Sequence, residues 1–431
     1  MKVKLIAIVA LVAAGVLVAF SSISSAASKT NEYNSYLDAA RANAKNKVPY
    51  MACQNYRQAF SVRCDDEDVY KEYLEQSKLL GESFYESAVN DYVTNFPQSP
   101  TAYEELCNYQ YDTESYKAVI QTALTAKELG VATEEVRKKY LECYYMFRYI
   151  CTDLEDASTF LGDYALVKKE GLYGYLSSYG SYLLYPIYKD ANAFLGTSTA
   201  VNDGKEWYMI NEGGYKIART DEKFDKMSFI SNGKIRVMKN GKYGYVDSSF
   251  KGKHAPEYEY ASNFKNSVAA VKKNGKWALI DSEEKAITEF MFEDILLDEY
   301  DTCINNGLIF AKKDGKYYIV NEKGEKVSEN GFEKAYPFMG DEPAAVCVKG
   351  KWGFVDTTGK MVIEPEYDNA KSFSNGLAPV CKGESWGYIN SDKEYRIKSQ
   401  FSDCLPFSDN GIAAVKEAEV WNYIKLLAYY E

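Results

Sequence analysis

The spacing of apolar residues changes along the chain near residue 160. From residue 32 to about 160, apolar and aromatic residues recur three and four positions apart, as at Tyr109, Tyr116, Ile120 and Leu124. This spacing is typical of a helix that buries one face. Glycine and proline interrupt it every 15–30 residues, which suggests consecutive antiparallel helix pairs. We therefore expect a helical domain over residues 32–160.

Beyond residue 165 the apolar runs become short and aromatic, and turn residues separate them. In residues 350–380, one apolar run covers Trp352 to Asp356 and a second covers Lys360 to Glu364. An Asp-Thr-Thr-Gly turn joins them, and a longer connection leads to a third run from Leu377 to Val380. Short β-branched and aromatic runs between turn residues predict three β-strands.

The aromatic residue that opens this stretch recurs every 34–40 residues. The recurring positions are Tyr173, Trp207, Tyr243, Trp277, Tyr317, Trp352, Trp386 and Trp421. All five tryptophans of the protein fall in this set. A second large apolar residue follows two positions later in each unit, so each unit has an apolar stripe on one sheet face. The pattern predicts an all-β domain over residues 165–426, built from about seven three-stranded repeats of about 35 residues.

Two turn signals accompany each repeat. Asn240-Gly241, Asn274-Gly275 and Asp314-Gly315 precede an aromatic position, with Lys349-Gly350 and Lys382-Gly383 as variants. Asn-Gly and Asp-Gly favour type I′ turns, so the last strand of one unit should pair with the first strand of the next. Asn or Asp also stands four residues after most of the repeated aromatic residues. Because half of these are Asn and no second carboxylate keeps a fixed offset, Asx turns are favoured over calcium ligands.

Part of the helical region resembles the tetratricopeptide repeat. In the segment AYEELCNYQYDTESYKAVIQTAL, from Ala102, the residues at that family's packing positions are Leu106, Asn108, Tyr111, Tyr116 and Ala123. Cys107 and Val119 depart from the family pattern. The resemblance implies a protein-binding helical surface. An unrelated helical bundle is the alternative.

The β-region resembles the WG-containing repeat, also called the KWG repeat, of bacterial proteins. The resemblance rests on GKWGFVD and the residues after it, with Gly353 and Gly387 completing the Trp-Gly pair. The glycine is replaced at Tyr208, Ala278 and Tyr318. This family implies a β-repeat without enzymatic activity. We expect a propeller closed by the terminal strand Val420 to Leu426, which would complete the first blade; an open β-solenoid is the alternative.

The first 27 residues have the features of an export signal or a membrane anchor. Lys2 and Lys4 precede an uncharged run from Leu5 to Phe20, and small polar residues follow. Both interpretations place the rest of the chain outside the cytoplasm, in the cell envelope or secreted. The net charge of −11 argues against nucleic acid as a partner, and against membrane contact beyond the N-terminal segment.

The sequence offers little for catalysis, a cofactor or a metal. His254 is the single histidine, and none of the GxSxG, Walker, HExxH or GxGxxG patterns occurs. The nine cysteines form no CxxC pair and are expected to be small buried hydrophobes, with a disulfide among the N-terminal five left open. An Asp/Glu glycosidase pair also stays open, because such pairs form in space. We therefore expect a non-enzymatic protein.

One repeat carries about six extra residues, which include Asp298, Glu299, Tyr300 and Asp301. Insertions in repeat proteins often lie on the binding face, although surface loops also accept insertions at little cost. Two functions remain: an exported or membrane-anchored scaffold for a protein partner, or an envelope glycan-binding protein that stacks sugars on exposed aromatic rings. The repeated aromatic residues alternate with Val and Ile, so we expect Trp352 and Trp386 to be buried in the core.

Overall fold

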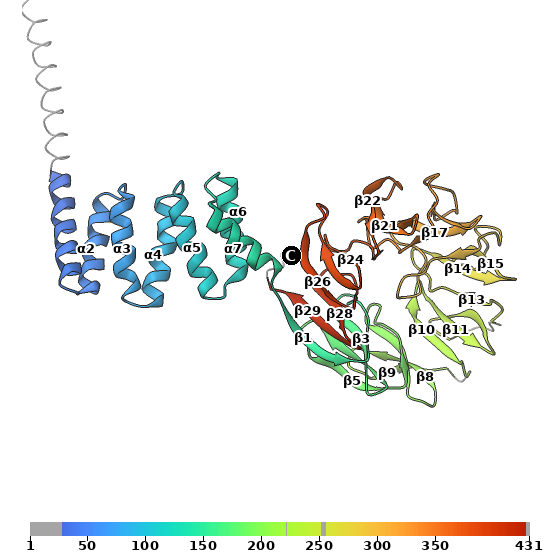
Figure 1. Cartoon of the computed structure of the whole chain (residues 1–431). Helices are drawn as coiled ribbons and strands as arrows, with labels where there is room; N and C mark the ends of the chain where they lie inside the picture. Colours follow the sequence, from blue (N-terminus) through green and yellow to red (C-terminus); the bar gives the residue numbers. More distant parts are fainter. Residues whose placement is uncertain (1–27, 221, 251–255, 428–431) are drawn as a thin grey trace, which may run out of the picture. The chain divides into compact units, whose positions relative to one another are not determined.

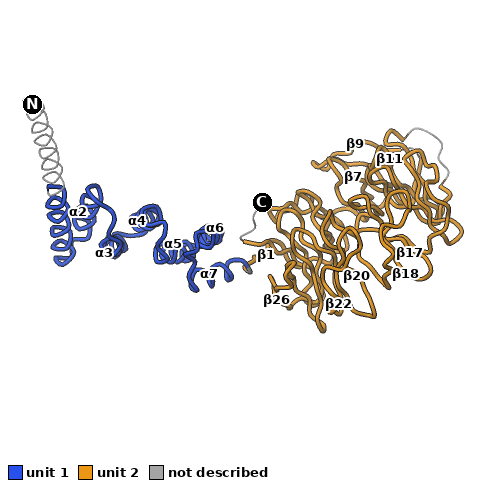
Figure 2. The backbone as a smooth tube through the Cα atoms, turned by 90° about the horizontal axis from the view of Figure 1, so that it is seen from above, with its two compact units in different colours: residues 1–144 blue, residues 145–431 orange. Residues whose placement is uncertain are grey.

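The computed structural model describes residues 28–220, 222–250 and 256–427. The chain divides into two compact units, with the boundary between Tyr144 and Tyr145 (Figure 2). The predicted export or anchor segment, residues 1–27, and His254 lie outside the described residues. Among the helices that the structure describes, none is long and apolar enough to cross a membrane.

The first unit is a row of helices (Figure 1). The first helix covers residues 28–45 of the described chain. The others are α2 (Pro49–Val62), α3 (Glu67–Lys78), α4 (Glu82–Asn95), α5 (Pro100–Asp112), α6 (Tyr116–Glu128) and α7 (Glu134–Tyr145). Local sequence sets their ends: Asp66 accepts hydrogen bonds from Asp68 N and Val69 N at the start of α3, and Ser99 caps α5. The predicted helices are confirmed.

Tyrosines form much of the core of the helical unit. The rings of Tyr70 and Tyr92 stack with their centroids 5.0 Å apart, and Phe60 stacks on Tyr70 at 4.9 Å. The hydroxyl of Tyr92 donates to Glu67 at 2.8 Å, and that of Tyr56 donates to Glu72 at 2.9 Å. Each ring therefore fills the core while its polar end keeps a partner. This pairing explains why a tyrosine-rich sequence can bury so many phenols.

The second unit is an eight-bladed β-propeller, in which each blade is an antiparallel sheet. Blade I holds β2 (Asp156–Ala157), β3 (Tyr164–Lys169), β4 (Leu172–Ser177) and β5 (Tyr182–Tyr188). Blade II holds β6 (Asp190–Ala191), β7 (Ser198–Asn202), β8 (Trp207–Asn211) and β9 (Lys216–Ala218). Blade III holds β10 (Lys226–Ser231), β11 (Lys234–Lys239) and β12 (Lys242–Asp247). Blade IV holds β13 (Tyr260–Ala261), β14 (Val268–Lys273) and β15 (Lys276–Asp281).

The remaining blades complete the ring. Blade V holds β16 (Asp294–Ile295), β17 (Leu308–Lys313) and β18 (Lys316–Asn321). Blade VI holds β19 (Lys334–Ala335), β20 (Ala344–Val348), β21 (Lys351–Val355) and β22 (Met361–Tyr367). Blade VII holds β23 (Asn369–Ala370), β24 (Ala378–Lys382), β25 (Ser385–Ile389) and β26 (Tyr395–Phe401). Blade VIII holds β27 (Asp403–Cys404), β28 (Ile412–Glu417), β29 (Val420–Leu426) and the N-terminal strand β1 (Phe147–Leu154).

Closure of the ring differs from the prediction in two respects. The propeller has eight blades rather than about seven, and Val420–Leu426 is a strand of blade VIII instead of completing the first blade. The reason is β1, which pairs antiparallel with β29 along Phe147–Leu154. Residues 147–154 therefore extend as a strand, and the helices end at Tyr145 rather than at the predicted residue 160.

Side-chain packing and hydrogen bonds join neighbouring blades. Ala345 and Phe354 of blade VI share a buried cluster with Ala378 and Val380 of blade VII. In four blades the second residue of the apolar stripe is a tyrosine that also hydrogen-bonds to the next blade. Its hydroxyl donates to a main-chain carbonyl of the next blade in Tyr175–Asn192, Tyr245–Ser262, Tyr388–Leu405 and Tyr423–Ser158. The last of these joins blade VIII to blade I, so the ring is closed by side chains as well as by β1.

Candidate functional site

The repeated aromatic positions belong to the blade cores. Trp207, Trp277, Tyr317 and Trp386 are buried, whereas Tyr173, Tyr243, Trp352 and Trp421 are half-buried. The expected burial of Trp386 is confirmed, and Trp352 is covered only in part. The set therefore stabilises the propeller and offers no continuous surface of stacking platforms.

The glycine after the aromatic residue has a steric role. Trp352 pairs with Tyr367 and Phe354 with Ile363, so three residues of β22 lie opposite Gly353 in a bulge. A Cβ at Gly353 would lie 2.4 Å from Ile363 O, and one at Gly387 would lie 2.6 Å from Ile397 O. Tyr208, Ala278 and Tyr318 replace the glycine in blades where the fourth strand is short or absent from the described sheet. In blades I, VI and VII the fourth-strand backbone therefore leaves no room for a side chain at the repeat glycine, whereas blade VIII has Asn422 at this position beside β1.

The predicted turns are confirmed. Asn240, Asn274 and Asp314 have positive φ and are followed by glycines with positive φ, as a type I′ turn requires. Asp356 Oδ1 accepts from Thr358 N and Lys360 N, and Asn390 Oδ1 accepts from Asp392 N and Glu394 N. These oxygens cap their own turns. No group of three His, Cys, Asp or Glu side chains in the described part of the chain could hold a metal ion.

The cysteines are thiols with raised pKa values. All nine lie among the described residues and are free, so the N-terminal five form no disulfide, and seven of the nine are buried. Burial raises the pKa of Cys107 to about 12 and that of Cys143 to about 11. Such thiols stay protonated at neutral pH, in agreement with their prediction as small hydrophobes.

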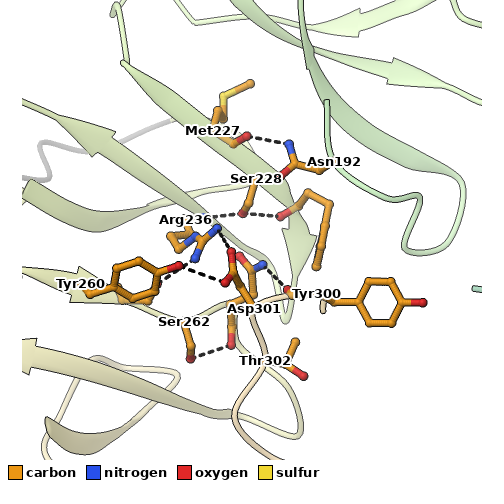
Figure 3. A network of polar contacts seen from close by, with 12 residues as sticks. Asn192, Met227, Ser228, Arg236, Tyr260, Ser262, Tyr300, Asp301 and Thr302 are labelled. Carbon is orange, nitrogen blue, oxygen red and sulfur yellow. Dashed lines mark hydrogen bonds and ion pairs between the residues drawn. The ribbon is translucent and has the colours of Figure 1, made fainter. Parts of the chain in front are cut away.

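The insertion in blade V includes Asp298 to Asp301, and side chains of blades III and IV hold its end at Tyr300 and Asp301 (Figure 3). Arg236 Nη2 of blade III lies 2.6 Å from Asp301 Oδ2, and Tyr260 OH of blade IV donates to Asp301 Oδ1 at 2.9 Å. Asn263 Nδ2 donates to Tyr300 O at 2.8 Å. Burial alone would lower the pKa of Arg236. The electrostatic and hydrogen-bond interactions with Asp301 and Tyr260 favour the charged guanidinium more strongly, so the pKa is raised. We call residues 298–301 the crossing loop, because its contacts lie on other blades.

The crossing loop also reaches blade I, four blades away around the ring. Thr159 N donates to Glu299 Oε2 at 2.9 Å, and Tyr300 OH donates to Thr159 O at 3.3 Å. Within the loop, Asp298 accepts from Tyr300 N and Thr302 N, which fixes the turn. The four residues predicted as a binding loop are therefore brought together, but as a tether across the ring rather than a free surface loop.

A cavity of about 900 Å³ adjoins the crossing loop, and residues from all eight blades line it. Its carboxylates are Asp163, Asp298, Glu299, Asp341, Glu342 and Asp409, and its one ammonium group is Lys265. Aromatic side chains, among them Phe160, Phe229, Phe264 and Phe338, form the apolar part of the wall. Sequence reasoning missed this site, because its residues are contributed singly by distant repeats.

Two carboxyl groups of the cavity, those of Glu299 and Glu342, have raised pKa values. Glu299 is accessible to solvent through the cavity, yet protein atoms surround it, and this desolvation raises its pKa. Burial likewise raises the pKa of Glu342, despite the hydrogen bond that Glu342 accepts from Gly376 N. Among the described residues neither carboxylate has an ion-pair partner, so both carry an electrostatic cost in their ionised form.

The outer edge of blade I and its neighbourhood expose large apolar and aromatic side chains. Strand β5 exposes 72% of Tyr185 and 62% of Ile187 on either side of Pro186. Tyr179 of blade I and Tyr215 of blade II are also exposed, at 89% and 74%. We call Tyr179, Tyr185, Ile187 and Tyr215 the blade I patch.

The corresponding positions in blades VI and VII are polar. In blade VI the residues on either side of Pro365 are Glu364 and Glu366, and in blade VII those on either side of Ser399 are Lys398 and Gln400. All four are exposed. The apolar character of blade I is therefore not imposed by the repeat. Aligning the units position by position would have revealed it from sequence.

Comparison with known proteins agrees with this architecture. Residues 223–243, 243–277, 352–385 and 386–421 match the family described as WG containing repeat. The tetratricopeptide-like segment has no such match. No curated protein has a matching sequence.

Solved structures with a similar arrangement are remote in sequence. Dihydro-heme d1 dehydrogenase NirN is 8% identical over 57% of this chain and 65% of its own, with a TM-score of 0.36. Hsv2 of Kluyveromyces lactis is 9% identical over 65% of this chain and 100% of its own, with a TM-score of 0.29. The AfRom2 CNH domain is 10% identical over 66% of this chain and 100% of its own, with a TM-score of 0.32.

Proposed function

We propose that this protein is a non-enzymatic binding scaffold, exported or anchored in the cell envelope, whose propeller docks a protein partner at the blade I patch. The observation that carries the proposal is the contrast between Tyr185 and Ile187 on β5 and the charged residues Glu364 and Glu366 at the same positions of β22. Large exposed apolar side chains on one edge strand are a liability unless something covers them.

The edge itself indicates the kind of partner. Strand β5 pairs with β4 on one side, and its other edge has no strand partner in the described sheet. An extended peptide can hydrogen-bond to such an edge while its alternate side chains contact the exposed apolar residues. The proposed occupant is therefore an extended protein segment with apolar residues at alternating positions. The bulge at Pro186 restricts the pairing to the ends of the strand.

Site-directed crosslinking tests this proposal. A photoreactive benzoylphenylalanine replaces Tyr185 in the full chain, and the matched control places it at Glu364 in blade VI. We expect one discrete protein to crosslink to the probe at position 185 and not to crosslink to the probe at position 364. The pair Tyr185→Glu and Ile187→Glu should then weaken binding of that purified protein at least about tenfold. Equal crosslinking at the two positions, or unchanged affinity, would contradict the proposal.

Envelope glycan is the second candidate partner, and the exposure of Tyr179 and Tyr215 favours it. Phenol rings with open faces can stack on sugar rings. Cosedimentation with protein-stripped cell wall checks this function, with Tyr179→Ala and Tyr215→Ala as the test pair and Glu322→Gln as control. Loss of pelleting in the test pair alone would identify these rings as the glycan site.

The helical unit is proposed as a second protein-binding surface, on the basis of the tetratricopeptide-like segment around Leu106 and Ala123. Both residues are buried, as packing positions should be. Tyr85 and Tyr109, whose rings meet edge to face at 5.5 Å, line a shallow pocket of this unit. Benzoylphenylalanine at Tyr109 tests the surface, and the absence of any specific crosslink would count against it.

The proposed location outside the cytoplasm rests on residues 1–27 and is tested separately. Exogenous protease should cleave the chain in intact cells whose outer layers have been permeabilised, and N-terminal sequencing distinguishes a cleaved signal from a retained anchor. Full protection of the chain would contradict export.

A further inference from the structure

A second and smaller cavity lies between blades II and III. Its volume is about 120 Å³, and we call it the interblade cavity. Asn192 and Trp207 of blade II line it, together with Lys226 and Arg236 of blade III and Asp301 of the crossing loop. Asn192, Arg236 and Asp301 are shown in Figure 3. The interface between blades VII and VIII has a lysine side chain at the corresponding place.

Lys371 of blade VII is that lysine. Its Nζ donates to Asp403 Oδ1 at 2.8 Å and to Cys404 O at 2.6 Å. The same Nζ lies 5.2 Å from the centre of the Trp386 ring. The ammonium group therefore occupies the space between the repeat tryptophan of one blade and the first strand of the next.

Asn192 holds the repeat position of Lys371, because each directly follows the short first strand of its blade. The Nδ2 of Asn192 donates to Met227 O at 2.8 Å, as Lys371 donates to Cys404 O. Asparagine is shorter than lysine, so it does not fill the space beside Trp207 that Lys371 fills beside Trp386. This difference in length accounts for the interblade cavity.

Two charged residues of the interblade cavity differ from their counterparts in other blades. Where the first strand begins, three blades place an aspartate opposite a lysine of the second strand: Asp156 and Lys168, Asp294 and Lys312, and Asp403 and Lys416. In blade II, Asp190 stands opposite Asn202, and in blade III, Lys226 stands opposite Met238. Neither Asp190 nor Lys226 forms an ion pair among the described residues. The cavity wall therefore carries one carboxylate and one ammonium group that no neighbouring charge of the described chain balances.

Arg236 differs from the repeat most clearly. Its position, opposite the second residue of the apolar stripe, is apolar in the other seven blades: Leu166, Ala200, Ala270, Phe310, Ala345, Pro379 and Ala414. The Arg236 side chain is 11% exposed and contacts Asp301 at 2.6 Å, a residue that the insertion supplies. A buried charge costs free energy even when it is paired. Its presence where seven blades fold with an apolar residue indicates a role other than packing.

We propose that the interblade cavity binds a free, small amino acid in its zwitterionic form. Asp190 and Asp301 balance the charges of Lys226 and Arg236, so the wall is neutral overall but carries both signs. A zwitterion complements such a wall, whereas a single ion would leave an unbalanced charge in a partly enclosed site. Because Arg236 and Asp301 already bind each other, Lys226 binds the carboxylate and Asp190 the ammonium group. A water molecule occupies about 30 Å³ of the liquid, so this space favours the smallest amino acids.

Two single substitutions each remove one charge from the cavity. Lys226→Gln changes an exposed side chain, and Asp190→Asn keeps an oxygen that can accept from Ala191 N. The matched controls are Lys334→Gln and Asp156→Asn. They make the same substitutions at the same repeat position in blades VI and I, outside the cavity.

A double variant fills the cavity with an arrangement that the protein already uses. Asn192→Lys with Lys226→Asp copies Lys371 and Asp403 of the interface between blades VII and VIII. Arg236 is left unchanged in every variant, because it holds the crossing loop. The double variant should therefore fold as the native chain does while its cavity is occupied by the new lysine.

Titration calorimetry of the full chain with glycine is the decisive measurement, with L-alanine, L-leucine, acetate and methylamine as parallel arms. We expect one glycine per chain. Acetate and methylamine should bind at least about tenfold more weakly, because each offers only one of the two charges. Leucine should not bind, since its side chain exceeds the space. Each single substitution should lower the affinity for glycine about tenfold, the double variant should abolish binding, and the controls should bind as the native chain does.

The outcomes separate the alternatives. Tighter binding of alanine than of glycine would support the proposal and identify the preferred side chain. Absence of binding by both amino acids, acetate binding as tight as glycine binding, or equal affinity in the cavity and control variants would overturn it. The thermal unfolding midpoint of each variant, followed by circular dichroism, should equal that of the native chain, so that a lost affinity is assigned to the cavity.

Discussion

Blades I and VI share one backbone design and differ on their outer surface. In both, a proline of the fourth strand lies against the repeat glycine: Pro186 against Gly174, and Pro365 against Gly353. In both, the aromatic residue of the third strand pairs with a tyrosine that ends the fourth strand. Beside the proline, however, blade I exposes Tyr185 and Ile187 where blade VI exposes Glu364 and Glu366. Packing fixes the inner positions, and the solvent positions are left free for function.

The largest expected effect concerns the shared core. Trp352→Ala should lower the free energy of unfolding by about 3 kcal/mol, somewhat less than for a fully buried aromatic residue because Trp352 is half-buried. Tyr173→Ala in blade I should have a similar or slightly smaller effect. Denaturant unfolding measures both, with the exposed Tyr185→Ala expected within about 0.5 kcal/mol of the native chain. A larger loss of unfolding free energy in Tyr185→Ala than in Trp352→Ala would contradict the assignment of Trp352 to the core and Tyr185 to the surface.

The next effect tests the bulge that the two blades share. Gly353→Ala and Gly174→Ala each place a methyl group within 3 Å of the fourth-strand backbone, so each should cost about 1–3 kcal/mol. Blade IV has Ala278 at this position and no fourth strand in the described sheet. Ala278→Gly should therefore cost only about 1 kcal/mol, from the lost methyl group and the greater freedom of the unfolded chain. Denaturant unfolding that leaves Gly353→Ala as stable as the native chain would show that the steric explanation is wrong.

The same comparison shows what the sequence could and could not reveal. The eight aromatic positions and the Asn-Gly turns predict strands, turns and pairing between consecutive units, because these depend on local sequence and a fixed period. The eighth blade depends on β1, which precedes the first repeat and carries no repeat signature. The cavity depends on single residues such as Thr159 and Asp409, which only ring closure brings together.

A smaller effect is expected from exchanging the two outer surfaces. Glu364→Tyr with Glu366→Ile gives blade VI the apolar edge of blade I on an equivalent bulge. If the blade I patch is sufficient for docking, the variant should bind a second copy of the crosslinked partner, with an affinity within about tenfold of the first. Calorimetric stoichiometry measures this. One site per chain in the exchanged variant would mean that neighbouring residues such as Tyr215 of blade II are also required.

The smallest effect concerns the turn after the aromatic strand, where blade VI has Asp356 and blade I has Ser177. The hydroxyl of Thr358 and two main-chain N–H groups bind the Asp356 carboxylate and lower its pKa. A carboxyl whose pKa is lowered in the folded state stabilises the protein above its unfolded pKa of about 4 and loses that contribution as pH falls through the folded value.

Asp356→Ser should therefore cost about 0.5–1 kcal/mol at pH 7, a small value because the turn is partly exposed and solvent screens the charge. At about pH 2 the native chain and the variant should differ by less, since the native carboxylate is then protonated. Urea unfolding at the two pH values measures this difference, and Ser177→Asp in blade I serves as the reciprocal change. A cost that is independent of pH would assign the turn's stability to its hydroxyl and main-chain hydrogen bonds, and the charge difference between the two blades would then have no part in it.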